Sequence, residues 1–213
     1  MGFLLRICLP DVPGSLGAVA TALGSAGADI EAIEIVERRH DGTVVDDVML
    51  SLPPSVMPDA LVTACHAIDG VTVQWISRYA AGASLTRDLE TVEELTAEPT
   101  HALARMVELL PGTFRSSWAV VVRPGNGSSQ VSHTSSTAPD VSAVASGWIG
   151  LSQTQQLPPV DAWPSTTLVG VPAKGRDGEP FVVVVGRHGG PDFLDSEIAR
   201  LGHIVALAAS VQA

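Results

Sequence analysis

The stretch Ile7-Cys8-Leu9-Pro10-Asp11-Val12-Pro13-Gly14-Ser15-Leu16-Gly17 decides the fold of the first half of the chain. An apolar strand runs into a Pro/Asp/Gly turn, and an amphipathic helix follows at once, with either Ser15 or Asp11 as its cap. Such a turn brings backbone N–H groups to the mouth of the helix, where the carboxylate of a small ligand can be held. We interpret the stretch as the ligand loop of a small-molecule sensing domain.

The hydrophobic pattern around this loop predicts four strands and two helices. Apolar residues alternate over residues 3–9, which indicates a strand, and recur at helical spacing from Leu16 until Gly27 ends the helix. Further strands are predicted at 29–38, 44–52 and 71–75, with a hairpin turn at Asp41-Gly42 and a helix over 57–68. The order strand–helix–strand–strand–helix–strand predicts a ferredoxin-like four-stranded antiparallel sheet with both helices on one face.

Two motifs in this half resemble the ACT domain, a family of amino-acid-sensing modules. They are Leu5-Arg6-Ile7-Cys8-Leu9-Pro10-Asp11-Val12-Pro13-Gly14-Ser15-Leu16 and Leu23-Gly24-Ser25-Ala26-Gly27-Ala28-Asp29-Ile30. The resemblance covers roughly residues 2–79. It implies that two copies pair side by side, and that a small effector binds between the first loop of one copy and the second-strand start of another. The ligand positions it implies are Asp11, Val12, Pro13, Gly14, Ser15, Leu16, Asp29 and Ile30.

The chemistry of these positions suits an amino acid or a related metabolite. Gly14 lets the backbone approach the ligand closely, and Asp11 can take an ammonium group while the N–H groups hold a carboxylate. Many family members carry Asn where Asp29 stands, so two acids at this site shift the preference toward the cationic end of the ligand. Alternatively, Asp-x-Pro-Gly is ordinary turn chemistry and Asp11 only caps the helix.

The second half of the chain predicts a second α+β domain. A linker is expected at residues 80–85, followed by a helix over 85–110 that is broken near Pro99. The remaining expectations are strands at 118–122, 130–136, 167–172 and 181–187, a short helix within 138–152, an irregular connection at 153–163, and a last helix capped by Asp192 or Ser196.

The end of this half resembles a GAF domain. The resemblance rests on Pro180-Phe181-Val182-Val183-Val184-Val185-Gly186-Arg187 followed by Phe193-Leu194-Asp195-Ser196-Glu197-Ile198-Ala199-Arg200-Leu201, and it spans about residues 86–212. GAF pockets bind cyclic nucleotides, bilins or other small molecules, but no cysteine lies here to attach a bilin. The expected organisation is an ACT-like domain at 1–79, the linker at 80–85, and a GAF-like domain with a central antiparallel sheet at 86–213.

Charge and composition exclude several classes of partner. The net charge of −11 is shared between both halves, which argues against nucleic acid and against anionic membranes. Cys8 and Cys65 lie in apolar patterns and fit a reducing compartment. No signal pattern or membrane-length apolar run is present. We expect a soluble, cytoplasmic protein, and a single lysine among many Arg and Ala residues is typical of a bacterial coding sequence.

No catalytic, cofactor or metal motif emerges from the sequence. The six histidines show no metal-ligand spacing, and neither a nucleophile elbow nor a phosphate loop is present. Asp46 and Asp47 are neighbours on a strand, so their side chains point to opposite faces and do not form a carboxylate pair. Arg187 and His188 are candidates to line a pocket, or belong to a solvated loop.

These patterns predict a non-catalytic regulatory or sensor protein, without a cofactor, that binds an amino acid or related metabolite and forms a homodimer. The alternative is an interaction module, in which the ACT-like domain only dimerises and the GAF-like domain docks a partner protein.

Overall fold

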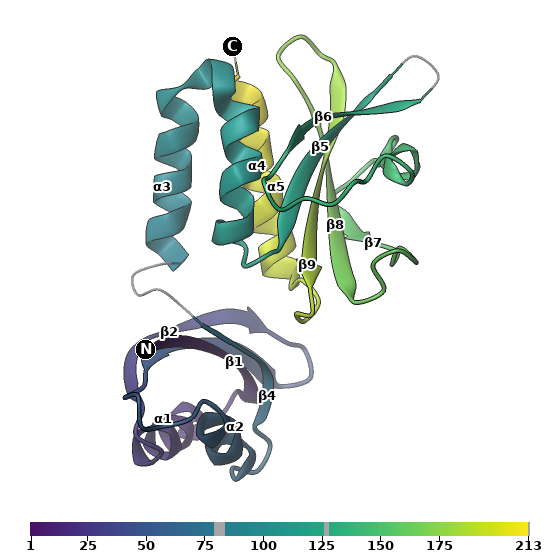
Figure 1. Cartoon of the computed structure of the whole chain (residues 1–213). Helices are drawn as coiled ribbons and strands as arrows, with labels where there is room; N and C mark the ends of the chain where they lie inside the picture. The colour runs from purple at the N-terminus through teal and green to yellow at the C-terminus, as the bar shows by residue number, and fades with distance from the viewer. Residues whose placement is uncertain (79–83, 126–127, 213) are drawn as a thin grey trace. The chain divides into compact units, whose positions relative to one another are not determined.

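The computed structural model describes residues 1–78, 84–125 and 128–212, and the chain divides into two compact units, Met1–Ala83 and Ser84–Ala213. Each unit has its own sheet (Figure 1). Of the linker expected at 80–85, residues 80–83 lie outside the described residues. Residues 84 and 85 already belong to the first helix of the second unit.

The first unit has the predicted element order. Its elements are β1 (Gly2–Pro10), α1 (Ser15–Ser25), β2 (Asp29–Arg38), β3 (Thr43–Ser51), α2 (Asp59–His66) and β4 (Thr72–Arg78). The strands form an antiparallel sheet in the order β2-β3-β1-β4, so β2 and β4 are its edges. Both helices lie on the same side of this sheet (Figure 1).

The core of the first unit lies between the sheet and the two helices. The odd residues of β1 face the helices together with their β3 partners, because directly opposite residues share a sheet face. Val19 and Leu23 of α1 and Leu61 and Cys65 of α2 complete this core, and all four are fully buried. One β3 residue in the apolar row is polar: Asp46, which is paired with Ile7.

Asp47 lies on the other sheet face, opposite Arg6, as strand alternation predicts. The Arg6 Nε–Asp47 Oδ1 distance is 2.7 Å and the Nη2–Oδ2 distance is 2.9 Å. The two side chains are only 1% and 2% exposed. This bidentate ion pair is therefore a buried, charge-assisted interaction between the two central strands.

The second unit is also built on one antiparallel sheet. Its helices are α3 (Ser84–Ala97), α4 (Ala102–Thr113) and α5 (Asp195–Val211), with short 3₁₀ turns at Pro99–His101 and Ala145–Trp148. The strands are β5 (Trp118–Pro124), β6 (Ser129–Thr134), β7 (Gln155–Leu157), β8 (Thr166–Lys174) and β9 (Pro180–His188), in the order β6-β5-β9-β8-β7. The break near Pro99 is confirmed. Strand β7 was not predicted, because three residues are too few to show an alternating pattern.

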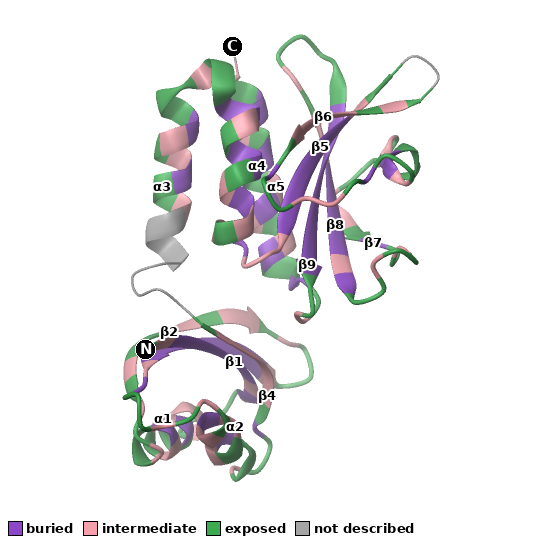
Figure 2. Cartoon of the chain, in the orientation of Figure 1, coloured by how far each residue is buried: buried purple, intermediate pink, exposed green. Residues whose placement is uncertain are grey.

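The sheet of the second unit is covered on both faces. Its central strand β9 sends Phe181, Val183 and Val185 toward α3, α4 and α5, and sends Val182 and Val184 toward the segment 138–163. This two-sided burial explains the unbroken Val182–Val185 run, and Figure 2 shows the central strands as continuously buried. The fold class, mixed α and β with antiparallel sheets, agrees with the prediction.

The start of α5 differs from the prediction. Neither Asp192 nor Ser196 caps it. Leu194 stands at the N-cap, and its N–H donates to the Glu197 carboxylate at 2.9 Å. Glu197 also accepts a hydrogen bond from Arg187, whose side chain is buried. A buried Glu three residues into the helix thus replaces the expected cap.

No helix within the described residues is long and apolar enough to cross a membrane.

Candidate functional site

The loop between β1 and α1 is held by backbone hydrogen bonds, one of them to the β2–β3 turn. The Asp11 N–H donates to the Gly42 carbonyl at 2.9 Å, and the Val12 N–H donates to the Pro10 carbonyl at 2.9 Å. Gly14 stands at the N-cap of α1 with φ of 96°, a left-handed conformation that favours glycine. No side chain caps this helix, so the prediction of Ser15 or Asp11 as a cap was wrong. The mouth of α1 is left without a side-chain acceptor.

The Asp11 carboxylate is paired with a cation of the same unit. Its Oδ2 lies 2.7 Å from Nη1 of Arg38, the last residue of β2. The side chains are 41% and 62% exposed, respectively. An exposed pair of this kind contributes about 0–1 kcal/mol. A ligand ammonium group can therefore compete for Asp11, and the released guanidinium can then face the carboxylate of that ligand.

Asp46 is the functional candidate that sequence reasoning missed. It is 1% exposed, and its Oδ1 has no hydrogen-bond partner among the residues that the structure describes. Burial raises the pKa of its carboxyl, the Asp11 and Asp47 carboxylates raise it further, and Arg38 opposes them. The signal was present in the sequence as one acid within an otherwise apolar alternating row.

Asp46 lies close to the β1–α1 loop in the sheet. It pairs with Ile7 and Ile35, whereas Val44, two residues earlier on the same face, pairs with Leu9 and Arg38. Diagonal neighbours of this kind are about 7–8 Å apart between backbones, within reach of a long side chain. The structure therefore gathers Asp46, Arg38 and Asp11 at the end of the sheet where α1 begins.

Asp29 and Ile30 are not brought to this place within one copy. Asp29 pairs with Ser51, which also faces Gly2, at the far end of the sheet from Pro10 and Thr43. The length of β2 separates Asp29 from Arg38, about 30 Å at roughly 3.3 Å per residue. Within one copy Asp11 and Asp29 therefore lie at opposite ends of the sheet, and a site that combines the first loop of one copy with the second-strand start of another stays a prediction.

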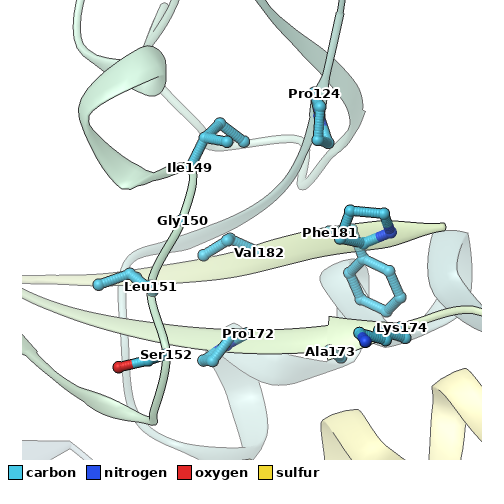
Figure 3. A pocket seen from close by; sticks show the side chains of 11 residues that line it. Pro124, Ile149, Gly150, Leu151, Ser152, Pro172, Ala173, Lys174, Phe181 and Val182 are labelled. Carbon is cyan, nitrogen blue, oxygen red and sulfur yellow. The ribbon is translucent and has the colours of Figure 1, made fainter.

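The second unit contains a cavity of about 470 Å³. Its walls come from the end of β5, from the β8–β9 hairpin and from the segment 149–152 (Figure 3). The middle of the same sheet face is closed by an apolar cluster that includes Trp118, Trp148 and Val184. The ring of Trp118 also lies against Trp163, with centroids 5.7 Å apart. The open volume is therefore beside the filled centre, toward the β8–β9 hairpin.

Among the described residues, no three His, Cys, Asp or Glu side chains are grouped as metal ligands. His188 is exposed, with its ring nitrogen 3.2 Å from the Thr166 hydroxyl. Burial and the Arg123 charge lower the pKa of His133.

Among solved structures, the chain is similar to GAF domains. No protein-family model and no curated protein matches the chain. The GAF domain of an Acinetobacter phosphoenolpyruvate-protein phosphotransferase is 15% identical with a TM-score of 0.44, covering 60% of this chain and 90% of that one. The GAF domain of a phosphoenolpyruvate-protein phosphotransferase from Coxiella burnetii is 15% identical with a TM-score of 0.43. This match covers 59% of this chain and 90% of that one. The match to an unknown protein from Galdieria sulphuraria covers 99% of this chain and 90% of that one, at 11% identity and a TM-score of 0.33.

Proposed function

We propose that this protein is a non-catalytic sensor of a small metabolite, and that an ACT-like first unit binds an amino acid or related amine in a homodimer. The observation that carries the proposal is the buried Asp46 carboxylate with an unpartnered oxygen, next to Arg38 and the β1–α1 loop. A buried carboxylate without a partner is costly in an empty site. The ammonium group of a ligand would remove that cost.

The same site offers groups for the other end of an amino acid. The uncapped mouth of α1 carries N–H groups and the positive end of the helix dipole, which favour a carboxylate. Gly14 leaves open space where a side chain would stand, since a Cβ added there meets no atom within 4 Å. The loop residues Asp11 to Leu16 would therefore hold the carboxylate, while Asp46 and Asp11 take the amine.

A second copy would supply the remaining predicted residues. β2 is an edge strand, and two β2 edges related by a twofold axis pair antiparallel. That pairing sets the strand start of one copy, Asp29 and Ile30, beside the strand end of the other, Arg38. Ile35 of this edge is 49% exposed and Val12 of the loop is 58% exposed, as expected of residues that a partner or ligand covers.

Titration calorimetry of the full chain with each of the twenty standard amino acids tests the proposal. We expect one or a few to bind, with an affinity that falls about tenfold or more in Asp46→Asn because a charge pair inside the site is lost. Asp59→Asn is the matched control, because Asp59 is an exposed acid at the start of α2. It should bind as the unchanged protein does.

The dimer is tested separately by sedimentation velocity. Ile35→Lys places a charge on the β2 edge and should give monomers that no longer bind the ligand. A protein that dimerises through β2 but binds no amino acid, with Gly14→Val and Asp11→Ala changing stability alone, would contradict the sensing role. That result would favour the interaction module, in which the first unit only dimerises and the GAF-like second unit docks a partner protein.

A further inference from the structure

The cavity of the second unit is lined mainly by apolar residues. Its floor is the β8–β9 hairpin, where Pro172 pairs with Val182 and Lys174 pairs with Pro180. Opposite residues share a face and alternate residues return to it, so these four side chains lie on the cavity face of the sheet. Lys174 carries the only charge among the 11 residues that line the cavity.

The wall opposite the hairpin is fixed in place by a close contact. Leu151 and Leu157 pack directly on the backbone of Gly170, and a Cβ at that position would lie 2.5 Å from Leu151 Cδ1. Figure 3 shows Ile149, Leu151 and Ser152 along this segment, across from Pro172 and Val182. Because Gly170 has no side chain, the segment 149–152 packs directly on β8. The cavity between this segment and the β8–β9 hairpin is therefore preformed.

The lysine side chain at this cavity has no partner in the part of the chain that the structure describes. Lys174 is exposed and makes no ion pair among the described residues, although the chain carries a net charge of −11 and this is its single lysine. A cavity of about 470 Å³ is of the size that encloses a small organic ligand. Apolar walls bury the body of such a ligand, and a lone ammonium group at the rim selects an anionic head.

We propose that the cavity lined by Pro172, Lys174 and Val182 binds an amphipathic organic anion, with an apolar or aromatic body and one carboxylate- or sulfonate-type head held by Lys174. This site lies within the second unit and uses none of the residues assigned to the amine site of the first unit. The protein would then sense two ligands of opposite character, one recognised by the acids Asp46 and Asp11 and one by a lysine.

A matched pair of fluorescent probes tests the charge preference directly. The aromatic sulfonate 8-anilinonaphthalene-1-sulfonate and the neutral N-phenyl-1-naphthylamine share one ring system and differ only in the sulfonate. We expect both to bind the full chain and the sulfonate to bind more tightly. Lys174→Gln should weaken the sulfonate about fivefold, the size expected of an exposed charge pair, and leave the neutral probe unchanged.

Two further variants locate the probe. Arg176→Gln removes another exposed cation of the same hairpin that does not line the cavity, and should change neither affinity. Ser152→Trp fills the cavity from its exposed rim and should weaken both probes. The proposal would be overturned if the two probes bound with equal affinity, or if Lys174→Gln and Arg176→Gln had equal effects. Unchanged binding of the probes to Ser152→Trp would also overturn it. So would a dye-induced change in the sedimenting mass, because the face would then be a protein interface.

Discussion

The guanidinium of Arg187 and the carboxylate of Glu197 form a buried ion pair that joins the end of β9 to the first turn of α5. Nη2 of Arg187 lies 3.0 Å from Oε1 of Glu197, and the side chains are 1% and 6% exposed. Arg187 also donates to the Phe114 carbonyl at 2.8 Å and lies over the Phe193 ring, 3.9 Å from its centroid. One cation thus connects α4, β9 and the start of α5.

Removing the acid of this pair should destabilise the second unit strongly. Glu197→Ala leaves a buried guanidinium uncompensated and frees the Leu194 N–H, which should cost about 3–5 kcal/mol. Urea unfolding followed by tryptophan fluorescence measures this, since Trp118, Trp148 and Trp163 report on this unit. Glu179→Ala, at an exposed loop, is the control and should stay within about 0.5 kcal/mol of the unchanged protein. A similar small loss in Glu197→Ala would contradict the structural role.

Asp46 makes the stability of the first unit depend on pH in an unusual direction. Burial raises the pKa of its carboxyl above the ordinary value of 3.8, so the folded state holds this proton more tightly than the unfolded state. Its stabilising contribution is therefore complete below pH 3.8 and is lost as the pH rises through the raised folded pKa.

The neutral variant Asp46→Asn avoids the cost of the buried charge. It should be more stable than the unchanged protein at pH 7 by about 1 kcal/mol. The difference should disappear near pH 3, where Asp46 is protonated. Thermal unfolding at a series of pH values without ligand checks this. A variant less stable at pH 7 would show that the carboxylate is satisfied in the folded protein.

Gly186 is required for the contact between β9 and Trp118. A Cβ at this position would lie 2.2 Å from Cε2 and 2.4 Å from Cζ2 of the indole. Gly186→Ala should therefore destabilise the second unit by about 1–3 kcal/mol and shift the tryptophan fluorescence. Gly202→Ala, inside α5, is the matched control, because its Cβ would meet only the Thr154 hydroxyl at 3.4 Å. It should be neutral or stabilise by about 0.5 kcal/mol.

The two cysteines should differ in reactivity. Burial raises the pKa of Cys65 to about 11, so roughly one molecule in a thousand carries its thiolate at pH 8, and the side chain is fully enclosed. Cys8 is half-buried. Ellman's reagent should titrate one thiol in the native protein and two in guanidinium, and Cys8→Ser should remove the native reaction. Rapid native modification of Cys65 would contradict the burial.

Much of the fold could be read from local patterns. The bounds predicted for β2 are those observed, and the alternation in β1 and β3 identified the core face because strand period and burial coincide there. The start of α5 could not be read in this way. The cap of α5 depends on the Glu197 carboxylate, which accepts hydrogen bonds from the Leu194 N–H and from Arg187, ten residues earlier in the chain. Local cap preferences therefore named the wrong residues.

The sequence identified the loop of the candidate site but not its buried acid, Asp46. Residues 11–16 are contiguous, so their common position at the mouth of α1 followed from the sequence. Asp46 was dismissed because its neighbour Asp47 points to the other face, although that alternation is what sends Asp46 into the core. Asp29 lies at the opposite end of the sheet from Asp11 within one chain, so its expected place beside the first loop of a second copy stays a prediction.

The sequence by itself determined most of the elements and, in the first unit, their order and the core face of β1 and β3, because period and turn chemistry are local properties of the chain. Only the tertiary structure decided which charges meet. The pairing register of β2, β3 and β1 placed Asp46, Arg38 and Asp11 together near the β1–α1 loop. The packing of 149–152 on Gly170 left a cavity beside Lys174. Such encounters depend on contacts between residues far apart in the chain, which no local pattern encodes.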